Sequence, residues 1–305
     1  KTNPTAFIIH TGDVCYEAHQ DFHGRYLRSE DLGVPTYYCV GNHDLRAGRY
    51  GEELWQSHFG PSWYSFDVGN VHYVVTPMLG GDHAPSYRRA DIIRWLKNDL
   101  AQINRDKRVV LFNHDLWFWG DDLLFKDKNG EQIDFADYNL DAMIYGHWHN
   151  HYYKQLKSGL HTYCSSTPDK GGIDHGTSCF RIYHADTKGK LSSETRYTYI
   201  DGILTSAYPA EGEIVSVSDG KMTVRINAYR TVSYAKKVTA SVERNGKIMS
   251  SVTLLPETDW EWSGTIRVSD GEQRLLVTAE FEDGTRLTKR VDYTVTGQPA
   301  ASAVT

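Results

Sequence analysis

The sequence predicts an α/β domain followed by an all-β domain. Over residues 5–200, apolar strand-like runs alternate with stretches of helical periodicity, as in α/β folds. Farther along, apolar residues recur at every second position, which is the period of strands with one buried face. The chain of 305 residues is also longer than one average domain. We therefore expect domains at 1–205 and 206–297, followed by a flexible tail at 298–305.

Helices of the first domain are predicted where apolar residues recur at helical spacing. The strongest case covers residues 86–103, where Ile92 and Leu96 fall on one face. Two further helices are expected at residues 50–59 and 22–32, the second on a weaker pattern.

Strands dominate the rest of the first domain. Residues 63–68 and 71–78 flank the pair Gly69-Asn70, which predicts a β-hairpin. From Tyr145 onward the pattern becomes a series of short strands. The apolar run before the first polar cluster, AFIIH, has no polar face, so it is expected to be an interior strand with neighbours on both sides.

Turn signals divide the second domain into short strands. Each is an Asx-Gly pair, a sequence typical of tight hairpin turns: Asp219-Gly220, Asn245-Gly246, Asp270-Gly271 and Asp283-Gly284. About seven strands at this spacing predict an immunoglobulin-like sandwich. Trp260 and Trp262 could bind sugar there, although packing in the core is the stronger expectation.

Composition excludes some classes of protein. The net charge of −6 argues against a binder of nucleic-acid duplexes, which would carry a basic surface. No apolar run reaches the roughly 18 residues of a transmembrane helix. The four cysteines lack metal-finger spacing, and buried free thiols are expected. Cys164 and Cys179 would form a disulfide only if their strands are neighbours.

Four polar clusters follow apolar runs in the first domain. They are Gly12-Asp13, Gly41–Asp44, Asn113–Asp115 and Gly146–His149. Each should lie at the carboxyl end of a strand, where ligands bind in α/β sheets. Together they offer a carboxylate, an amide oxygen and several imidazoles, which suit borderline divalent metals. The clusters therefore predict a metal site.

In order and spacing these clusters resemble the calcineurin-like metallophosphoesterase family. The family pattern runs D-x-H, G-D, G-N-H-[DE], a lone His and G-H-x-H, and the last four blocks match across roughly residues 5–165. The resemblance implies a four-layer α/β/β/α sandwich and a hydrolase of small phosphodiesters or phosphomonoesters. It also implies two divalent transition metals (Mn, Fe or Zn) and attack by a metal-bridging hydroxide.

The resemblance assigns the ligands of both metals. Asp13 would bridge them, and Asn42, His114 and His147 would complete the first metal. His149 would reach the second metal together with Asp13. The D-x-H block has no counterpart before Gly12-Asp13 in the sequence and would have to precede Lys1. If the chain begins at Lys1, one metal is expected. An additional strand upstream of Lys1 is the favoured explanation for the missing block.

Other residues near the clusters have predicted roles. By resemblance, His43 protonates the leaving oxygen, and either Asp44 or Glu17 orients it. Arg46 could hold a phosphate oxygen. The aromatic side chains after His114, Trp117 and Trp119, could form a wall for the substrate or could instead pin a loop onto the core. His10 and Asp115 are expected to support ligands without binding metal.

Two rival functions remain open at this point. A non-catalytic binding or adhesion protein would keep a degenerate metal site, and a protein phosphatase would act on phosphopeptides. The expected partner of the first domain is a small-molecule phosphoester, whereas no partner of the β-sandwich is indicated. Similarity of the sandwich to accessory modules of secreted bacterial phosphoesterases predicts a periplasmic, secreted or surface-anchored protein.

Overall fold

The computed structural model describes residues 4–14, 29–45, 51–168, 171–173, 176–198 and 200–297. Contacts divide the chain into an N-terminal unit that ends at Arg196 and a C-terminal unit that begins at Tyr197. The expected division after residue 205 would cut through β13 (Ile203–Tyr208), which pairs with β15 (Lys221–Tyr229) of the C-terminal unit. The division in the structure therefore precedes this strand.

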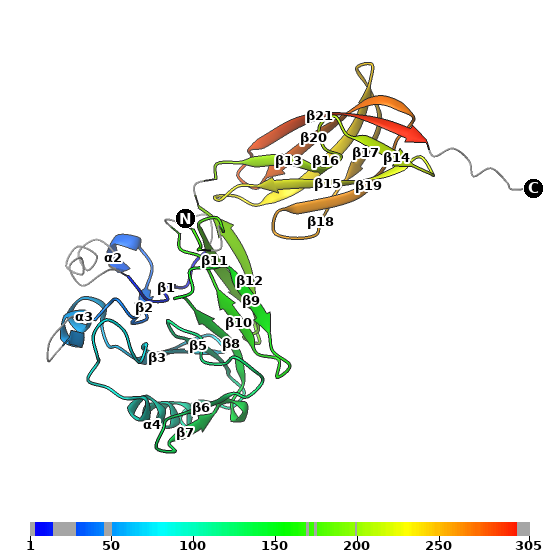
Figure 1. Ribbon diagram of the computed structural model, residues 1–305. Helices are drawn as coiled ribbons and strands as arrows, with labels where there is room; N and C mark the ends of the chain where they lie inside the picture. Colours follow the sequence, from blue (N-terminus) through cyan, green and yellow to red (C-terminus); the bar gives the residue numbers. More distant parts are fainter. Residues whose placement is uncertain are drawn as a thin grey trace, which may run out of the picture. The chain divides into compact units, whose positions relative to one another are not determined.

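A six-stranded mixed sheet forms the centre of the N-terminal unit (Figure 1). The strand order is β3-β4-β5-β8-β10-β9, with β4, β5, β8 and β10 parallel and the two outer strands antiparallel to their neighbours. The strands are β3 (Tyr64–Val68), β4 (Val71–Val75), β5 (Arg108–Phe112), β8 (Leu140–Tyr145), β9 (Tyr152–Gln155) and β10 (His161–Cys164). The β3–β4 hairpin at Gly69-Asn70 confirms its prediction.

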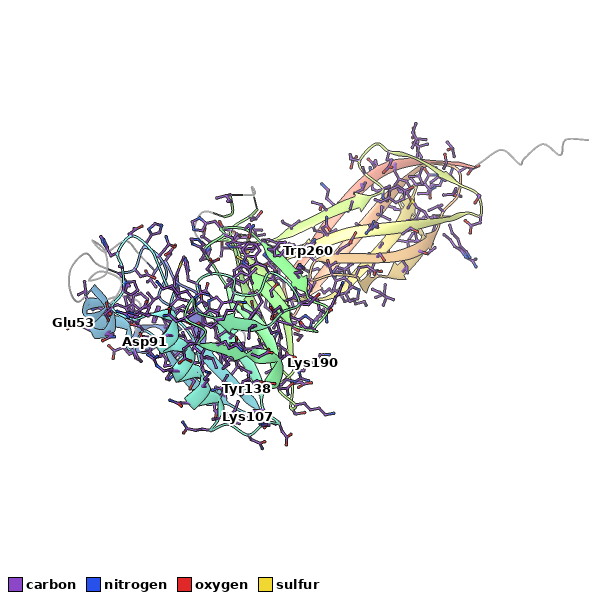
Figure 2. All side chains as sticks on the ribbon, turned by 60° about the horizontal axis from the view of Figure 1, so that its bottom comes forward. Glu53, Asp91, Lys107, Tyr138, Lys190 and Trp260 are labelled. Atoms are coloured by element: carbon purple, nitrogen blue, oxygen red, sulfur yellow. The ribbon has the colours of Figure 1, made fainter. Side chains whose placement is uncertain are left out.

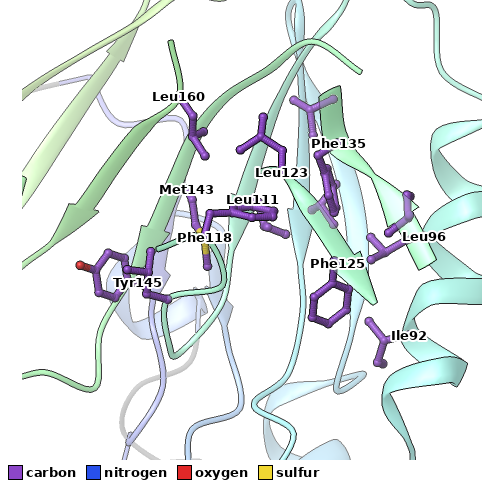
Figure 3. Packing of buried hydrophobic residues seen from close by; sticks show 14 of the residues in the cluster. Ile92, Leu96, Leu111, Phe118, Leu123, Phe125, Phe135, Met143, Tyr145 and Leu160 are labelled. Atoms are coloured by element: carbon purple, nitrogen blue, oxygen red, sulfur yellow. The ribbon is translucent and has the colours of Figure 1, made fainter. Parts of the chain in front are cut away.

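One face of this sheet packs against helix α4 (Arg89–Leu100). The helix begins where Asp91 accepts a hydrogen bond from the Arg88 amide at 2.8 Å. Ile92 and Leu96 of its apolar face belong to the same buried cluster as Leu111 of β5 and Met143 of β8, all labelled in Figure 3. The hairpin of β6 (Leu124–Lys126) and β7 (Gln132–Asp134) and the 3-10 turn Phe135–Asp137 complete this core. The predicted helix at 86–103 is confirmed.

The opposite face packs against two strand pairs. These are the parallel pair β1 (Ile8–His10) and β2 (Thr36–Tyr38), and the pair β11 (Cys179–Ala185) and β12 (Leu191–Tyr197). Within the described residues β1 has β2 as its sole hydrogen-bonded neighbour, and Ile8 is 40% exposed, so the expected second neighbour is not observed.

Helix α3 (Gly51–Phe59) contributes a fully buried Trp55, which packs with Tyr38 and Val40 after β2. This helix confirms the prediction at 50–59. Only the last part of the helix predicted at 22–32 falls in the described residues, as α2 (Ser29–Leu32).

Two β-sheets share one hydrophobic core in the C-terminal unit. One sheet has the order β13-β15-β19-β18, and the other has the order β14-β21-β20-β16-β17. Besides β13 and β15, the strands are β14 (Ile214–Val217), β16 (Ala235–Arg244), β17 (Lys247–Thr253), β18 (Leu255–Pro256), β19 (Glu261–Arg267), β20 (Gly271–Phe281) and β21 (Arg286–Gly297). The apolar side chains that recur at every second position thus fill the space between two sheets.

Turns and tryptophans of this unit follow the sequence pattern. All four predicted Asx-Gly turns have glycine in the left-handed region, with φ between 66° and 101°. Trp262 is buried in the core, whereas Trp260, labelled in Figure 2, is half-buried and packs against Tyr197. The tail at 298–305 lies outside the described residues.

Cys39, Cys164 and Cys179 are buried free thiols, so the conditional Cys164–Cys179 disulfide is not formed. Within the described ranges, no helix combines the length and apolar character needed to cross a membrane.

Candidate metal centre

The predicted ligand clusters all lie directly after strands, as expected. Strands β1, β2, β5 and β8 end at His10, Tyr38, Phe112 and Tyr145. Backbone hydrogen bonds continue past these ends: Cys39 donates to His10 at 2.8 Å, and Gly146 donates to His114 at 3.0 Å. Neighbouring strand ends are therefore linked in pairs, which brings the polar clusters to one edge.

His114 occupies the middle of the site. Its Nδ1 lies 2.6 Å from the carbonyl oxygen of Thr11, which can only accept, so Nδ1 carries the proton. Its Nε2 faces two further oxygens at 3.1 Å, Oδ2 of Asp13 and Oδ1 of Asn42. Either a proton on Nε2, donated to Asp13, or a cation among the three atoms that takes the place of that proton satisfies these oxygens. The donor set fits a divalent metal.

Charge interactions within the site shift the pKa values of three of these side chains. Burial raises the pKa of Asp13, but the hydrogen bond and positive charge of His114, with the amide of His43, lower it to about 2. Burial lowers the pKa of His114, yet Asp13 outweighs this effect and raises it. Burial, followed by the charge of His114, lowers the pKa of His147. Asp13 thus stays ionised and His147 tends to be neutral, as metal ligands require, whereas His114 would give up its Nε2 proton on binding a metal.

The four predicted ligands of the first metal come together. Ligand atoms of Asp13, His114 and His147 all lie within 4.8 Å of one another, and Asn42 joins them through its contact with His114. In the described part of the chain His149 falls outside that group, although its charge acts on His147.

Three of these side chains extend from strained backbone. Asp13, His147 and His149 have φ values of 53°, 64° and 47°, in the left-handed region that non-glycine residues rarely adopt. Each such residue costs about 1–2 kcal/mol. Strain of this kind persists where the surrounding structure enforces it, and it concentrates at functional sites.

Two glycines permit the close approach of the loops. A Cβ on Gly12 would lie 2.4 Å from Nδ1 of His114, and a Cβ on Gly41 would lie 2.3 Å from both the amide nitrogen and Oδ1 of Asp13. Neither distance is compatible with a side chain. The G of the G-D cluster and the G of the G-N-H-D cluster are therefore needed because a ligand from another loop packs against each.

Asp44 is fully buried and ties two loops together. One of its carboxylate oxygens accepts the amides of Gly41 at 2.6 Å and Asp13 at 2.8 Å. The sequence had suggested Asp44 or Glu17 as the partner that orients His43, and Glu17 lies outside the described residues. The structure instead places Asp82 there, with its Oδ2 2.6 Å from Nδ1 of His43.

The loop that carries Asp82 follows β4. Its backbone joins the ligand loop through hydrogen bonds from Met78 to Val40 and from Asp82 to Asn42, both 2.9 Å. Gly81 is required at this approach, since a Cβ would lie 2.3 Å from the carbonyl oxygen of Asn42. Sequence reasoning missed Asp82. The signal was present, because Gly80-Gly81-Asp82 follows the buried strand β4 as the other clusters follow theirs.

Asn113 and Asp115 hold the loop of His114. The Asn113 amide donates to the Thr76 hydroxyl at 2.9 Å and the Pro77 carbonyl at 3.0 Å. Asp115 accepts a hydrogen bond from the indole of Trp148 at 3.0 Å, which joins this loop to the G-H-W-H loop. The expectation that Asp115 supports ligands agrees with this contact. His10, also expected to give support, stacks near Tyr38 with ring centroids 6.3 Å apart.

The two tryptophans predicted to bind substrate differ in environment. Trp117 stacks on Phe125 with ring centroids 3.7 Å apart and packs against the core, which supports the alternative that it pins its loop onto the core. Trp119 is 68% exposed. Arg46, the predicted phosphate contact, lies outside the described residues.

Comparison with known proteins gives a family match over the N-terminal residues. Residues 1–151 match the calcineurin-like phosphoesterase family, and the N-terminal unit belongs to that family of metallophosphoesterases. Purple acid phosphatase 21 of Arabidopsis thaliana is 27% identical over 127 residues, which cover 35% of this chain and 28% of the relative. Purple acid phosphatase 13 of the same plant is 24% identical over 105 residues, covering 30% and 18%. The aligned region thus spans less than a third of each relative.

Among solved structures, fibronectin(III)-like modules of Clostridium thermocellum CbhA match with 14% identity and a TM-score of 0.26. This match covers 32% of the present chain and 100% of the other.

Proposed function

We propose that the N-terminal unit hydrolyses small phosphomonoesters or phosphodiesters, with metal held by Asp13, Asn42, His114 and His147. The observation that carries this proposal is the position of His114. Its Nε2 faces the side-chain oxygens of Asp13 and Asn42, while its Nδ1 is hydrogen-bonded to the carbonyl oxygen of Thr11. His149 and Asp13 would contribute to a second ion. Bound Mn, Fe or Zn ions activate water at neutral pH and neutralise charge on phosphoryl oxygens.

His43 is the proposed donor of the proton that the leaving oxygen takes up. Two contacts hold it: its amide donates to Oδ1 of Asp13 at 3.1 Å, and its Nδ1 pairs with Asp82. With Nδ1 bonded to a carboxylate, the proton to be transferred is the one on Nε2. Asp82 orients the ring through Nδ1, whereas Asp44 fixes the loops that carry Asp13 and His43.

We also propose the finer architecture implied by the sequence. Clusters on both faces of the central sheet, with α4 on one side and the β1–β2 pair followed by α3 on the other, support a four-layer α/β/β/α order. In the C-terminal unit, the first two strands, β13 and β14, belong to different sheets. Strand β14 pairs with β21 in parallel. The two sheet orders support an immunoglobulin-like sandwich.

Metal content and turnover, measured together, test the proposed function. The purified protein is loaded with Mn or Zn, dialysed, analysed for bound metal and assayed on p-nitrophenyl phosphate and bis(p-nitrophenyl) phosphate. We expect bound metal and turnover for the wild type. His114→Ala should weaken metal binding by at least about 100-fold and reduce turnover of both esters. The matched control is His184→Ala, whose side chain is 57% exposed and pairs with Glu194.

Three results would contradict the proposal in different ways. Failure to bind metal would refute the ligand set. Tight metal binding without turnover of either ester or of phosphopeptides would favour a binding protein. Turnover confined to phosphopeptides would favour a protein phosphatase.

A further inference from the structure

An exposed aromatic surface lies beside the candidate metal centre. Trp119 is the most exposed aromatic side chain in the described part of the chain, at 68%. Its ring stacks on that of Trp148, with centroids 5.0 Å apart and planes 32° apart. So large an apolar ring is left in water, and its burial energy is not gained.

Trp148 is held rigidly beneath Trp119. Its indole nitrogen donates to Asp115 at 3.0 Å, and its ring packs against Tyr145 at 5.1 Å and Tyr152 at 5.9 Å. Trp148 also packs against the core that α4 covers. The surface is therefore set in place before any ligand arrives, which reduces the entropy lost on binding.

The chain itself couples this surface to the ligands. Trp148 lies between His147 and His149, and its hydrogen-bond partner Asp115 follows His114. Adjacent Cα atoms are about 3.8 Å apart, so the surface begins within one residue of two ligand positions. The organic substituent of a phosphate bound at the metal centre would extend over a distance comparable to this one-residue separation.

The geometry and charge of the surface limit its ligand. Trp119 and Trp148 are closer to parallel than to perpendicular, which suits a flat ring better than a cation enclosed by steeply angled rings. Acidic residues lie on both sides of Trp119 in the sequence, at Asp115, Asp121 and Asp122. Their charges disfavour a second phosphate at this place.

We propose that Trp119, backed by Trp148, binds a planar aromatic group of the phosphoester substrate by stacking. A nucleobase and a simple aryl group share this chemistry. The inference rests on the proposed function, because it names the substrate class of the same site. Stacking of one base on an aromatic side chain corresponds to a change of about 5- to 150-fold in affinity.

Pairs of substrates that differ only in the ring test the proposal. Adenosine 5′-monophosphate and ribose 5-phosphate both release a primary alcohol, as do 2-phenylethyl and 2-cyclohexylethyl phosphate. In the metal-loaded wild type we expect kcat/KM, measured by phosphate release, to be at least about 5-fold higher for the aromatic member of at least one pair. Trp119→Ala should bring that ratio close to one, and Trp119→Phe should restore most of it.

The matched control is Tyr153→Ala. Tyr153 is 48% exposed and packs against His161 and Tyr163 rather than against Trp148. This variant should keep the wild-type ratio. A preference in the nucleotide pair alone would identify a nucleobase as the ligand, and a preference in the phenylethyl pair alone would identify a simple aryl group. Equal rates within both pairs for the wild type, or an unchanged ratio in Trp119→Ala, would overturn the proposal.

Calorimetric titration separates this inference from the proposed function. If no substrate is turned over, the proposed hydrolysis fails, but the aromatic surface can still be judged by binding. Adenosine 5′-monophosphate or 2-phenylethyl phosphate should then bind the wild type more tightly than its non-aromatic counterpart, and Trp119→Ala should abolish the difference. Equal binding within both pairs by the wild type would refute the surface as well.

Discussion

The two units use the same uncommon backbone conformation for different purposes. The C-terminal unit contains one described non-glycine residue with positive φ, Asn245, in the Asn-Gly turn between β16 and β17. Asparagine tolerates this conformation, and the turn simply reverses the chain. In the N-terminal unit the positions are Asp13, His147 and His149, all proposed ligands. There the conformation occurs in the loops that carry the candidate metal ligands.

Buried polar side chains differ between the units in the same way. The C-terminal core is almost entirely apolar, with Ser233 and Gln273 as its buried polar residues among those described. The N-terminal unit buries Asp44, Asn113 and His114, and their hydrogen bonds all act on the ligand loops. The C-terminal unit thus has a regular apolar core, whereas the N-terminal unit places buried polar side chains around the candidate site. Four predictions test this contrast.

The largest effect is expected for the proposed proton donor. His43→Ala should slow hydrolysis of an alkyl phosphoester by about 10²–10⁴-fold, because an alkoxide leaves poorly without a proton. It should slow a p-nitrophenyl ester much less, because that anion is stable alone. Asp82→Asn should also slow the alkyl ester more than the p-nitrophenyl ester, with a loss of about tenfold on the alkyl ester. Kinetics on both esters, with metal content measured in parallel, provide the comparison.

Asp106→Asn, a change at an exposed site in the loop after α4, is the control and should leave both rates unaltered. Equal losses on both esters together with reduced metal content would make His43 a ligand or a support instead of an acid.

A core substitution should separate the stabilities of the two units. Phe281 is fully buried in the C-terminal core, so Phe281→Ala should destabilise that unit by about 3–5 kcal/mol. Metal binding and turnover should persist at temperatures where the N-terminal unit remains folded. Calorimetric unfolding, followed beside activity, would show one transition shifted and the other unchanged. A joint shift of both transitions would mean that the units unfold together.

A pair of glycine substitutions compares the loops directly. Gly41→Ala would place a methyl group against Asp13 and should cost about 2–4 kcal/mol and weaken metal binding. Gly246, with φ of 75° and open space around it, should cost only about 1 kcal/mol when changed to alanine. Denaturant unfolding measures both. Similar costs would show that the site loops relax as readily as a hairpin turn.

The smallest effect concerns a buried histidine away from the site. Both ring nitrogens of His72 face carboxylates, Asp67 at 2.8 Å and Asp99 at 2.9 Å. Lys107, labelled in Figure 2, also pairs with Asp67. Burial lowers the pKa of His72, but Asp99 and Asp67 outweigh it and raise the pKa above its ordinary value of 6.5. The resulting stabilisation is complete below about pH 6.5 and is lost as the pH rises through the higher folded-state value.

His72→Gln should therefore cost about 1 kcal/mol at pH 6 and less at pH 8. Urea unfolding of both proteins at the two pH values gives the difference. A cost that grows with pH would contradict the proposed charged state of His72.

The regular elements could be predicted because a single local pattern defines each. The apolar face of α4, the β3–β4 hairpin and the Asx-Gly turns of the C-terminal unit all depend on residues close in sequence. The positions of the ligand clusters after strands were predictable for the same reason. The boundary between units was not, because β13 is recognised only by its pairing with β15.

Contacts within the site depended on loop paths that the sequence does not encode locally. The partner of His43 is 39 residues away, and its identification needs the path of the loop after β4. The contrast between Trp117 and Trp119 also escaped prediction, because both residues belong to one aromatic run and only tertiary packing distinguishes them. Short-range patterns therefore located the site, and long-range contacts determined the roles within it.

The close packing of the site glycines has a consequence for inheritance and for engineering. Gly12 packs against His114, Gly41 against Asp13, and Gly81 against Asn42. Each glycine therefore leaves room for a candidate ligand that another segment supplies. A change in one segment therefore demands an adjustment in its neighbour. Such segments should be inherited as a set, and transplanting one of them into an unrelated α/β protein should fail unless its counterparts are moved with it.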